Sequence, residues 1–164
     1  MSSVTVIPSV REAVSDPRIL LFGRLLGAAN GWEHLLAKEL QDETGLEHTL
    51  FELLVVVGRA GPDGIAVRDI AQARVLTSGG ATRLVQRGVQ RGFVTRKPST
   101  EDARVQLVNL TEEGERMLLH SSAVHAANIE RTLLAVLPEE HRAAFAASVE
   151  ALSKEAARAL PIMP

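Results

Sequence analysis

The 164-residue chain contains no cysteine, and none of its apolar runs approaches the roughly 20 residues needed to cross a bilayer. Without cysteine, disulfides, thiolate nucleophiles, zinc-thiolate sites and cysteine redox switches are excluded. The N-terminal segment also lacks the basic stretch followed by an apolar run that marks a secretory signal. We therefore expect a cytoplasmic protein without a membrane partner.

Signatures of catalysis are missing as well. The sequence has no phosphate-binding loop, no nucleophile elbow, no HExxH motif and no paired-carboxylate pattern. We expect neither enzymatic activity nor a cofactor. The composition does provide 46% hydrophobic residues, which is enough for the core of one domain, with or without an added dimerisation element.

Charge is distributed unevenly along the chain. The formal net charge of −2 argues against a nucleic-acid partner, because binding to phosphate relies on Lys and Arg. However, residues 68–104 hold eight basic and three acidic side chains, a net charge of +5, so the remainder carries −7. Since a polyanion responds to the local field of the surface it meets, residues 68–104 form a candidate nucleic-acid surface.

The spacing of apolar residues predicts a first long helix over about 17–41, capped by Ser15 or Asp16. It also predicts a second helix over 46–58 whose inward face consists of Leu46, Leu50, Leu53, Leu54 and Val57. Glycines recur every four residues in the first helix, at Gly23, Gly27 and Gly31. Such a stripe favours either the close approach of another backbone or a loosened, kinked helix.

Two short helices are expected over 68–75 and 77–91, after a short strand over 65–67, and their tight connection is the geometry of a helix-turn-helix. In the second helix three arginines, spaced four apart, share nearly one face. These are Arg83, Arg87 and Arg91. No carboxylate is interleaved among them, so we expect them to repel one another unless an outside anion compensates.

The start of this second helix has little side-chain bulk. Thr77 or Ser78 is positioned to cap it, and Gly79 and Gly80 follow. A helix N-terminus with small residues can bring its free N–H groups close to a phosphate or a base edge. We expect this end of the helix to contact nucleic acid.

A β-hairpin, or wing, is predicted next, with a strand starting at Phe93, a turn over 98–102 and a second strand over 104–110. Arg96 and Lys97 lie on the first strand and Arg104 at the root of the second. An arginine on such a ribbon can enter the narrow minor groove of a duplex.

The acidic residue of this turn has a different expected role. Asp102 would be repelled by DNA, so we expect it to shape the wing by accepting backbone N–H bonds or by pairing with an arginine.

Two amphipathic helices are expected in the C-terminal part. Thr111 is placed to cap one that runs to about Leu137 and is broken by Pro138. The final helix carries an apolar stripe of Phe145, Val149, Leu152, Ala156 and Leu160. With the first helix, these have more apolar surface than the compact module can cover, which predicts a two-fold dimer.

These segments together resemble the MarR family of bacterial transcriptional regulators. The resemblance rests on GIAVRDIA, TSGGATRLVQRGVQRGFVTR and DARVQLVNLTEEG, and above all on Asp102, Arg104, Leu110, Thr111 and Gly114 at the family's wing spacing. It implies a mainly α fold with a small β-hairpin, namely a winged helix-turn-helix with long N- and C-terminal dimerisation helices. One departure is Gly88, where the family usually has a core leucine; this puts local packing in question.

The resemblance implies a homodimeric regulator, expected to be a repressor, that binds a near-palindromic operator in double-stranded DNA. The expected organisation is an N-terminal flexible arm (1–15), a dimerisation helix (16–45), a DNA-binding region (46–111) and C-terminal dimerisation helices (112–164). The expected DNA-binding residues are Thr77, Ser78, Gly79, Thr82, Arg83, Arg87, Arg96, Lys97 and Arg104.

Release of DNA by a small aromatic or anionic effector is common in this family. The matching region holds Trp32, His34, His48 and Phe51, where a ligand wall and ordinary core packing remain alternatives.

A zinc-responsive regulator of the same fold remains open as well. His120 and His125 are five residues apart and cannot chelate one ion together from their helix, which leaves His34, His48 or His125 with carboxylates from other helices. His125 alone is expected to be a hydrogen-bonded core histidine.

An interaction protein that has lost DNA binding is the remaining alternative. It would have no need for Arg83, Arg87 and Arg104 to stay unpaired, as the sequence leads us to expect.

Overall fold

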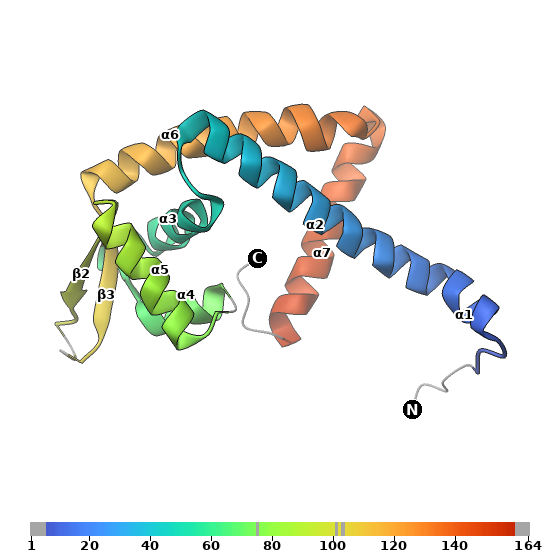
Figure 1. Ribbon diagram of the computed structural model, residues 1–164, viewed down its shortest axis with the longest axis horizontal. Helices are drawn as coiled ribbons and strands as arrows, with labels where there is room; N and C mark the ends of the chain where they lie inside the picture. The colour runs from blue at the N-terminus through green and yellow to red at the C-terminus, as the bar shows by residue number, and fades with distance from the viewer. Residues whose placement is uncertain (1–5, 75, 101, 103, 160–164) are drawn as a thin grey trace. The chain divides into compact units, whose positions relative to one another are not determined.

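The structure, a computed structural model, describes residues 6–74, 76–100, 102 and 104–159 (Figure 1). Its elements are α1 (Val10–Ser15), α2 (Pro17–Thr44), α3 (His48–Ala60), the 3-10 turn η1 (Gly61–Asp63), β1 (Ile65–Ala66), α4 (Val67–Ala73), α5 (Ser78–Gln90), β2 (Val94–Pro98), β3 (Gln106–Leu110), α6 (Glu112–Asn128), the π-turn η2 (Ile129–Leu133), the 3-10 turn η3 (Leu134–Val136) and α7 (Glu139–Ala159). The chain is mainly helical with one small sheet, as predicted. It divides into two compact units, one ending at Leu36 and the other beginning at Ala37.

The first unit contains α1 and most of α2. Helix α1 lies in the segment expected to be a flexible arm, where no helix was predicted. Its signal is a capping box, in which Ser9 Oγ accepts a hydrogen bond from the Glu12 N–H at 3.2 Å and donates one to the Glu12 carboxylate at 3.0 Å. Asp16 caps the start of α2 by accepting the Arg18 N–H at 2.8 Å.

The apolar face of α2 is exposed in this unit, with Leu21 69% and Phe22 60% accessible. The glycine stripe is open too: a Cβ added to Gly23, Gly27 or Gly31 would meet no atom within 4 Å. Among the described residues, no helix is both long and apolar enough to cross a membrane.

The second unit is built around α3, which is apolar on most of its circumference. Leu50, Leu53, Leu54 and Val57, all predicted to face inward, are at most 1% exposed. They pack with Ile70 of α4, Leu84 and Val85 of α5, Val94 of β2 and Val108 of β3. Each fully buried side chain of this kind contributes roughly 1.5–3 kcal/mol. This core fixes the helix-turn-helix and the wing against one helix.

The sheet is antiparallel with strand order β1-β3-β2. Val94 of β2 pairs with Leu110 of β3 and Pro98 with Gln106, while Ile65 of β1 pairs with Val108. The predicted hairpin is therefore present, although β3 begins at Gln106 rather than at residue 104. The short strand β1 extends it at the base.

The Leu-Thr-x-x-Gly end of the wing joins the sheet to α6. Thr111 Oγ1 accepts the Gly114 N–H at 2.9 Å, which caps α6, and donates to the Gly92 carbonyl at 2.6 Å. A Cβ at Gly114 would lie only 1.9 Å from the Phe93 carbonyl oxygen. Glycine is required here because the first turn of α6 packs directly on the backbone that enters β2.

Gly88 lies at a similarly crowded place in α5. A Cβ there would lie 2.9 Å from Val94 Cγ2 and 3.0 Å from Leu53 Cδ2, so its neighbours already fill the space of a side chain. Val94 and Leu53 therefore pack tightly against Gly88. A glycine in a helix costs roughly 1 kcal/mol relative to alanine, and the close contact of these side chains is possible only without a Cβ.

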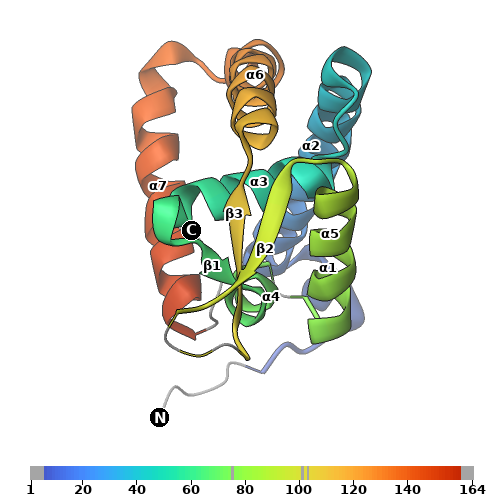
Figure 2. The same cartoon turned by 90° about the vertical axis from the view of Figure 1, so that its left-hand side faces the viewer.

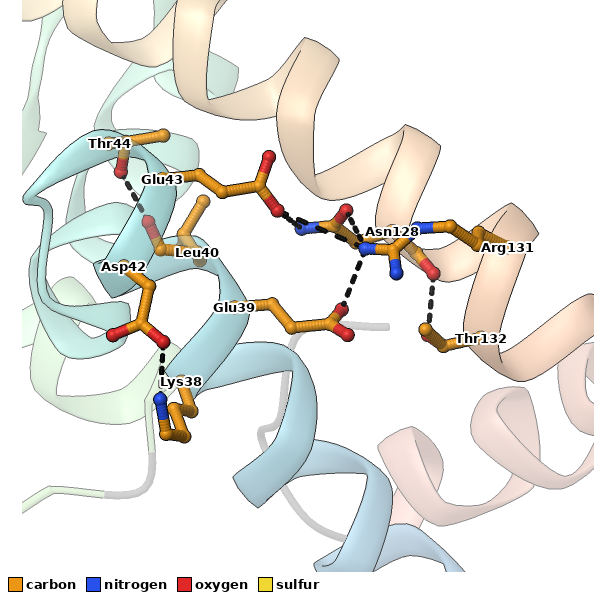
Figure 3. Close-up of polar contacts among 9 residues, drawn as sticks. All are labelled: Lys38, Glu39, Leu40, Asp42, Glu43, Thr44, Asn128, Arg131 and Thr132. Atoms are coloured by element: carbon orange, nitrogen blue, oxygen red, sulfur yellow. Dashed lines mark hydrogen bonds and ion pairs between the residues drawn. The ribbon is translucent and has the colours of Figure 1, made fainter.

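The helix expected to run to about Leu137 is α-helical to Asn128 and continues through η2 and η3 to Val136; Figure 3 shows the polar contacts around Asn128. Asn128, 3% exposed, donates its amide to Glu43 Oε1 of α2 at 3.0 Å and accepts from Arg131 at 2.8 Å. Thr132 donates its hydroxyl to the Asn128 carbonyl at 2.5 Å, a back-bond that bends helices. These side chains join the last turns of α2 to α6, which the apolar pattern could not reveal.

Candidate nucleic-acid interface

The predicted helix-turn-helix consists of α4 and α5. Of the two candidate caps of α5, Thr77 is the one used: its Oγ1 accepts the Gly80 N–H at 3.1 Å. Ser78, Gly79 and Thr82 are exposed near this cap, while Leu84 and Val85 lie on the buried face of α5. The first turn of α5 therefore presents small and hydroxyl side chains to the outside.

The three arginines of α5 and its C-terminus have different surroundings. Arg83 is exposed and, among the described residues, has no ion pair. Arg87 forms an ion pair with Glu47, the N-cap residue of α3. Arg91 lies with its guanidinium carbon 5.5 Å from the ring centre of Phe93. The expectation that Arg87 is unpaired was wrong, because its carboxylate comes from a residue forty positions earlier in the chain.

The wing carries three exposed cations. Arg96 and Lys97 lie on β2, and Arg104 lies just before β3 with 92% of its side chain accessible. Asp102 Oδ1 accepts the Arg104 backbone N–H at 3.0 Å and its Nε–H at 3.2 Å. Arg104 was expected to be unpaired, and that was wrong; the pair is local to the turn and leaves most of the guanidinium open.

These contacts set the charge state of Asp102. The backbone N–H of Arg104, and next its side chain, hold the pKa of Asp102 below the usual value, and the charge of Arg68 lowers that pKa further. The carboxylate is therefore anionic and holds the turn by accepting both bonds.

Arg68 is a residue that the sequence analysis did not single out. It begins the basic stretch at the N-terminal end of α4, with its side chain 78% exposed. With Arg96, Arg104 and Thr82 it lines a notch of about 350 Å³ between α4, α5 and the wing. Its position at the start of the +5 stretch was the available signal, but only the fold brings α4 next to the strands.

These elements converge on one side of the second unit. In Figure 2 the N-terminal end of α5, α4 and the ends of β2 and β3 near the hairpin turn all point the same way, away from α6. The cations Arg68, Arg83, Arg96 and Arg104 come from these elements. Such an arrangement can bind a polyanion along a helix and a ribbon simultaneously.

The residues suggested for an effector wall are divided between the two units. Trp32, partly buried, and His34, exposed, belong to the first. In the second, His48 and Phe51 form a ring cluster with His125, whose centroid is 5.1 Å from that of Phe51 and 5.9 Å from that of His48.

His125 does not have the expected hydrogen bond. Its Nδ1 is buried with no hydrogen-bond partner among the described residues, since its neighbours are the two rings. Burial, and next the nearby His48, lower the pKa of His125. Within the described part of the chain, no group of three or more His, Asp or Glu residues is arranged to hold a metal ion.

Comparisons with known proteins agree with this geometry. The sequence model of the MarR family matches residues 44–105. An uncharacterised HTH-type transcriptional regulator, YdgJ of Bacillus subtilis, is 26% identical over 118 residues, which are 72% of this chain and 71% of that protein.

Two solved structures share the fold. Sco3205, a MarR family transcriptional regulator from Streptomyces coelicolor solved in complex with DNA, has a TM-score of 0.75 and 20% identity, with 94% of this chain and 92% of that chain covered. CouR from Rhodococcus jostii, bound to p-coumaroyl-CoA, has a TM-score of 0.67 and 24% identity, with 84% and 92% covered. Residues 44–105 thus match the MarR family, and the fold of the chain is that of solved MarR family transcriptional regulators.

Proposed function

We propose that the protein is a homodimeric repressor that binds a near-palindromic operator in duplex DNA. The observation that carries the proposal is that α5, the notch at Arg68 and the wing lie on one side of the second unit. The chain outside residues 68–104 is acidic. A net −7 outside residues 68–104 would repel DNA, so the approach of a duplex is favourable only over this surface.

Helix α5 enters the major groove in this proposal. Its first turn, at Ser78 and Gly79, has little side-chain bulk and directs free N–H groups outward. Thr82 and Arg83 reach the base edges, where an arginine forms its strongest contact with guanine. Thr77 keeps its side chain on the helix cap, so its contribution is to orient these groups.

The wing and the notch act on the DNA backbone and the minor groove. The Arg104 side chain is 92% exposed and its turn is held by Asp102, so we assign it to the minor groove. Arg68, Arg96 and Lys97 bind flanking phosphates. Arg68 and Arg104 each have one carboxylate nearby, Asp69 and Asp102, but their side chains are 78% and 92% exposed, which supports a phosphate in the notch.

Apolar surfaces outside the DNA-binding region support the dimer. On α7, Phe145 (41%), Val149 (44%) and Leu152 (59%) are exposed, and Phe145 and Val149 line an open groove of about 860 Å³. In the first unit the apolar face of α2 is exposed as well. A second copy of the chain would cover such surfaces. In this proposal residues 16–45 and 112–164 are the dimerisation elements, and residues 46–111 are the DNA-binding region.

Regulation by a small aromatic or anionic effector, in the cytoplasm, is part of the proposal. It is supported by CouR, a protein of this fold bound to p-coumaroyl-CoA, and by the ring cluster that His48 and Phe51 form with His125 in the second unit. Adding phenolic acids and their thioesters to a DNA-binding assay tests this. Release of DNA by a member of the series is expected, and no release by any would contradict this part.

Footprinting on the DNA that flanks its own gene tests the main proposal. We expect protection of a near-palindromic site on one face of the duplex, with two half-sites about one helical turn apart. Sedimentation should give the mass of a dimer at micromolar concentration. A monomer, or the absence of any protected site, would contradict the proposal.

A further inference from the structure

Glu47 makes an unusual contact for a residue at its position. It is the N-cap residue of α3, yet its side chain makes no capping hydrogen bond to that helix. Its carboxylate instead forms an ion pair with Arg87 of α5. The free N–H groups at the start of α3 thus donate no hydrogen bond to this carboxylate, which pairs with a cation of another helix.

A second carboxylate of α3 offers a comparison. Glu52 pairs with Arg74, the C-cap residue of α4, and their side chains are only 21% and 31% exposed. In the Glu47 and Arg87 pair the side chains are 49% and 43% exposed. The first pair is largely enclosed and fixes α4 to α3, whereas the second lies where solvent, salt and an approaching anion can reach it.

Arg87 also occupies the position from which a phosphate would be reached. It lies one helical turn after the exposed Arg83, at the edge of the face on which Leu84, Val85 and Gly88 are buried. A phosphate offers a guanidinium the same bidentate geometry as a carboxylate. Glu47 therefore binds, within the protein, a guanidinium that a phosphate could bind in the same way.

We propose that Glu47 holds Arg87 in the free protein and gives it up to a backbone phosphate when DNA binds, so that Glu47 limits the affinity for duplex DNA. The inference rests on the proposed function and adds a residue outside the helix-turn-helix to the determinants of affinity. An exposed pair is weak enough for this exchange, since such pairs contribute about 1 kcal/mol or less. After the exchange the freed carboxylate remains close to the phosphate and repels it.

The test compares four proteins on operator DNA by fluorescence anisotropy across a salt series: wild type, Glu47→Gln, Arg87→Gln and the double variant. Glu47→Gln should bind roughly two- to fivefold more tightly, the range expected for an exposed ion pair. Arg87→Gln should bind about tenfold more weakly, and its slope of log affinity against log salt should be shallower by about one per subunit. In the double variant the gain from Glu47→Gln should largely disappear, because it acts through Arg87.

A matched control separates this effect from a simple change of net charge. Glu113 pairs with Arg116 on α6, with side chains 50% and 66% exposed, so Glu113→Gln removes the same charge from a comparable pair away from α5. It should leave DNA affinity nearly unchanged. Arg87→Lys keeps the charge and should retain the salt slope, so it serves as a second variant if Arg87→Gln folds poorly. Thermal melts check the folding of all the proteins.

Two results would overturn the inference. Unchanged affinity and salt slope in Arg87→Gln would mean that Arg87 stays on Glu47 in the complex. An affinity of Glu47→Gln equal to that of wild type and Glu113→Gln would mean that the pair does not oppose binding. Failure of the proposed function is a separate outcome, because the wild-type protein itself would then not bind the operator.

Discussion

Arginines in two regions of the second unit have different environments. At the junction of α2 and α6, Arg131 donates to Asn128 and lies 3.6 Å from Glu39 and 3.9 Å from Glu43, so it is held by three side chains (Figure 3). On the side formed by α5 and the wing, Arg83 has no ion pair among the described residues, and Arg104 has one carboxylate within its own turn. The comparison separates arginines that hold the fold from those available to a partner.

Glutamates show the same division. Glu39 Oε2 is buried and makes only the 3.6 Å ion pair, which is too long for a hydrogen bond, so this oxygen has no hydrogen-bond partner in the described part of the chain. Glu47, by contrast, is half exposed beside α5. Changes at the junction should thus alter stability, and changes on the α5 and wing side should alter DNA binding alone.

The largest effect is expected at the glycine that joins the wing to α6. Gly114→Ala puts a methyl group 1.9 Å from the Phe93 carbonyl oxygen, which forces the backbone to move, at a cost of about 3 kcal/mol or more. Gly79→Ala is the matched change on the DNA side, where a Cβ meets nothing within 4 Å. Urea denaturation should show a large loss of stability for Gly114→Ala and none for Gly79→Ala. Equal losses would mean that the packing at Gly114 and the open surface at Gly79 do not differ in their effect on stability.

Asn128→Ala should have the next largest effect. It deprives Glu43 and Arg131 of a partner that is 3% exposed, at a cost of about 1–3 kcal/mol. Operator affinity of the folded dimer should change much less than the urea midpoint. A variant with wild-type stability but weakened DNA binding would contradict a purely structural role for this junction.

Arg104→Ala changes the wing, where an effect on DNA binding without an effect on stability is expected. Loss of a minor-groove arginine should weaken operator binding about tenfold, with the dimer mass and the melting temperature unchanged. Arg158→Ala, an exposed cation on α7 paired with Glu155, is the control and should bind as wild type does. Equal affinities for the two variants would exclude Arg104 from the interface.

The smallest effect is a pH dependence of stability from the ring cluster. Because the folded-state pKa of His125 is lowered from the ordinary 6.5, the unfolded chain binds more protons just below that pH. The free energy of unfolding should therefore fall as the pH decreases below about 6.5. His48 is the titratable group that faces His125, and the Oε2 atom of Glu52 lies 3.9 Å from Nδ1 of His48.

Removing the titrating group tests this dependence. His125→Phe keeps a ring beside Phe51 and should flatten the decrease in stability between about pH 7 and about pH 5, a range that includes the ordinary histidine pKa. His120→Gln, at an exposed position on the same helix, should leave it as in wild type. The same pH dependence in wild type and His125→Phe would assign the effect to other groups.

Local patterns predicted much of the fold. The start of α2, the inward face of α3, the Thr111 cap and the hairpin each depend on residues close together in the chain, and the structure has all of them. Helix α1 was missed although its capping box, Ser9 and Glu12, is equally local.

What the sequence could not show are contacts between distant segments. The Glu47 and Arg87 pair joins residues forty positions apart, and the Glu43 and Asn128 contact joins residues eighty-five apart. Arg68 becomes part of the notch only because β1 and α4 fold against the hairpin. Periodicity carries no information about such pairs, so the carboxylate partner of Arg87 could not be foreseen, whereas the Asp102 and Arg104 pair is local to its turn.

The most direct test of the account is the salt dependence of operator binding by the wild-type dimer. If the cations of α5, the notch and the wing neutralise phosphates, log affinity should fall linearly with log salt, with a slope of about −4 or steeper for a dimer. A flat line over the same salt range would contradict the central claim that this basic surface is where the duplex binds.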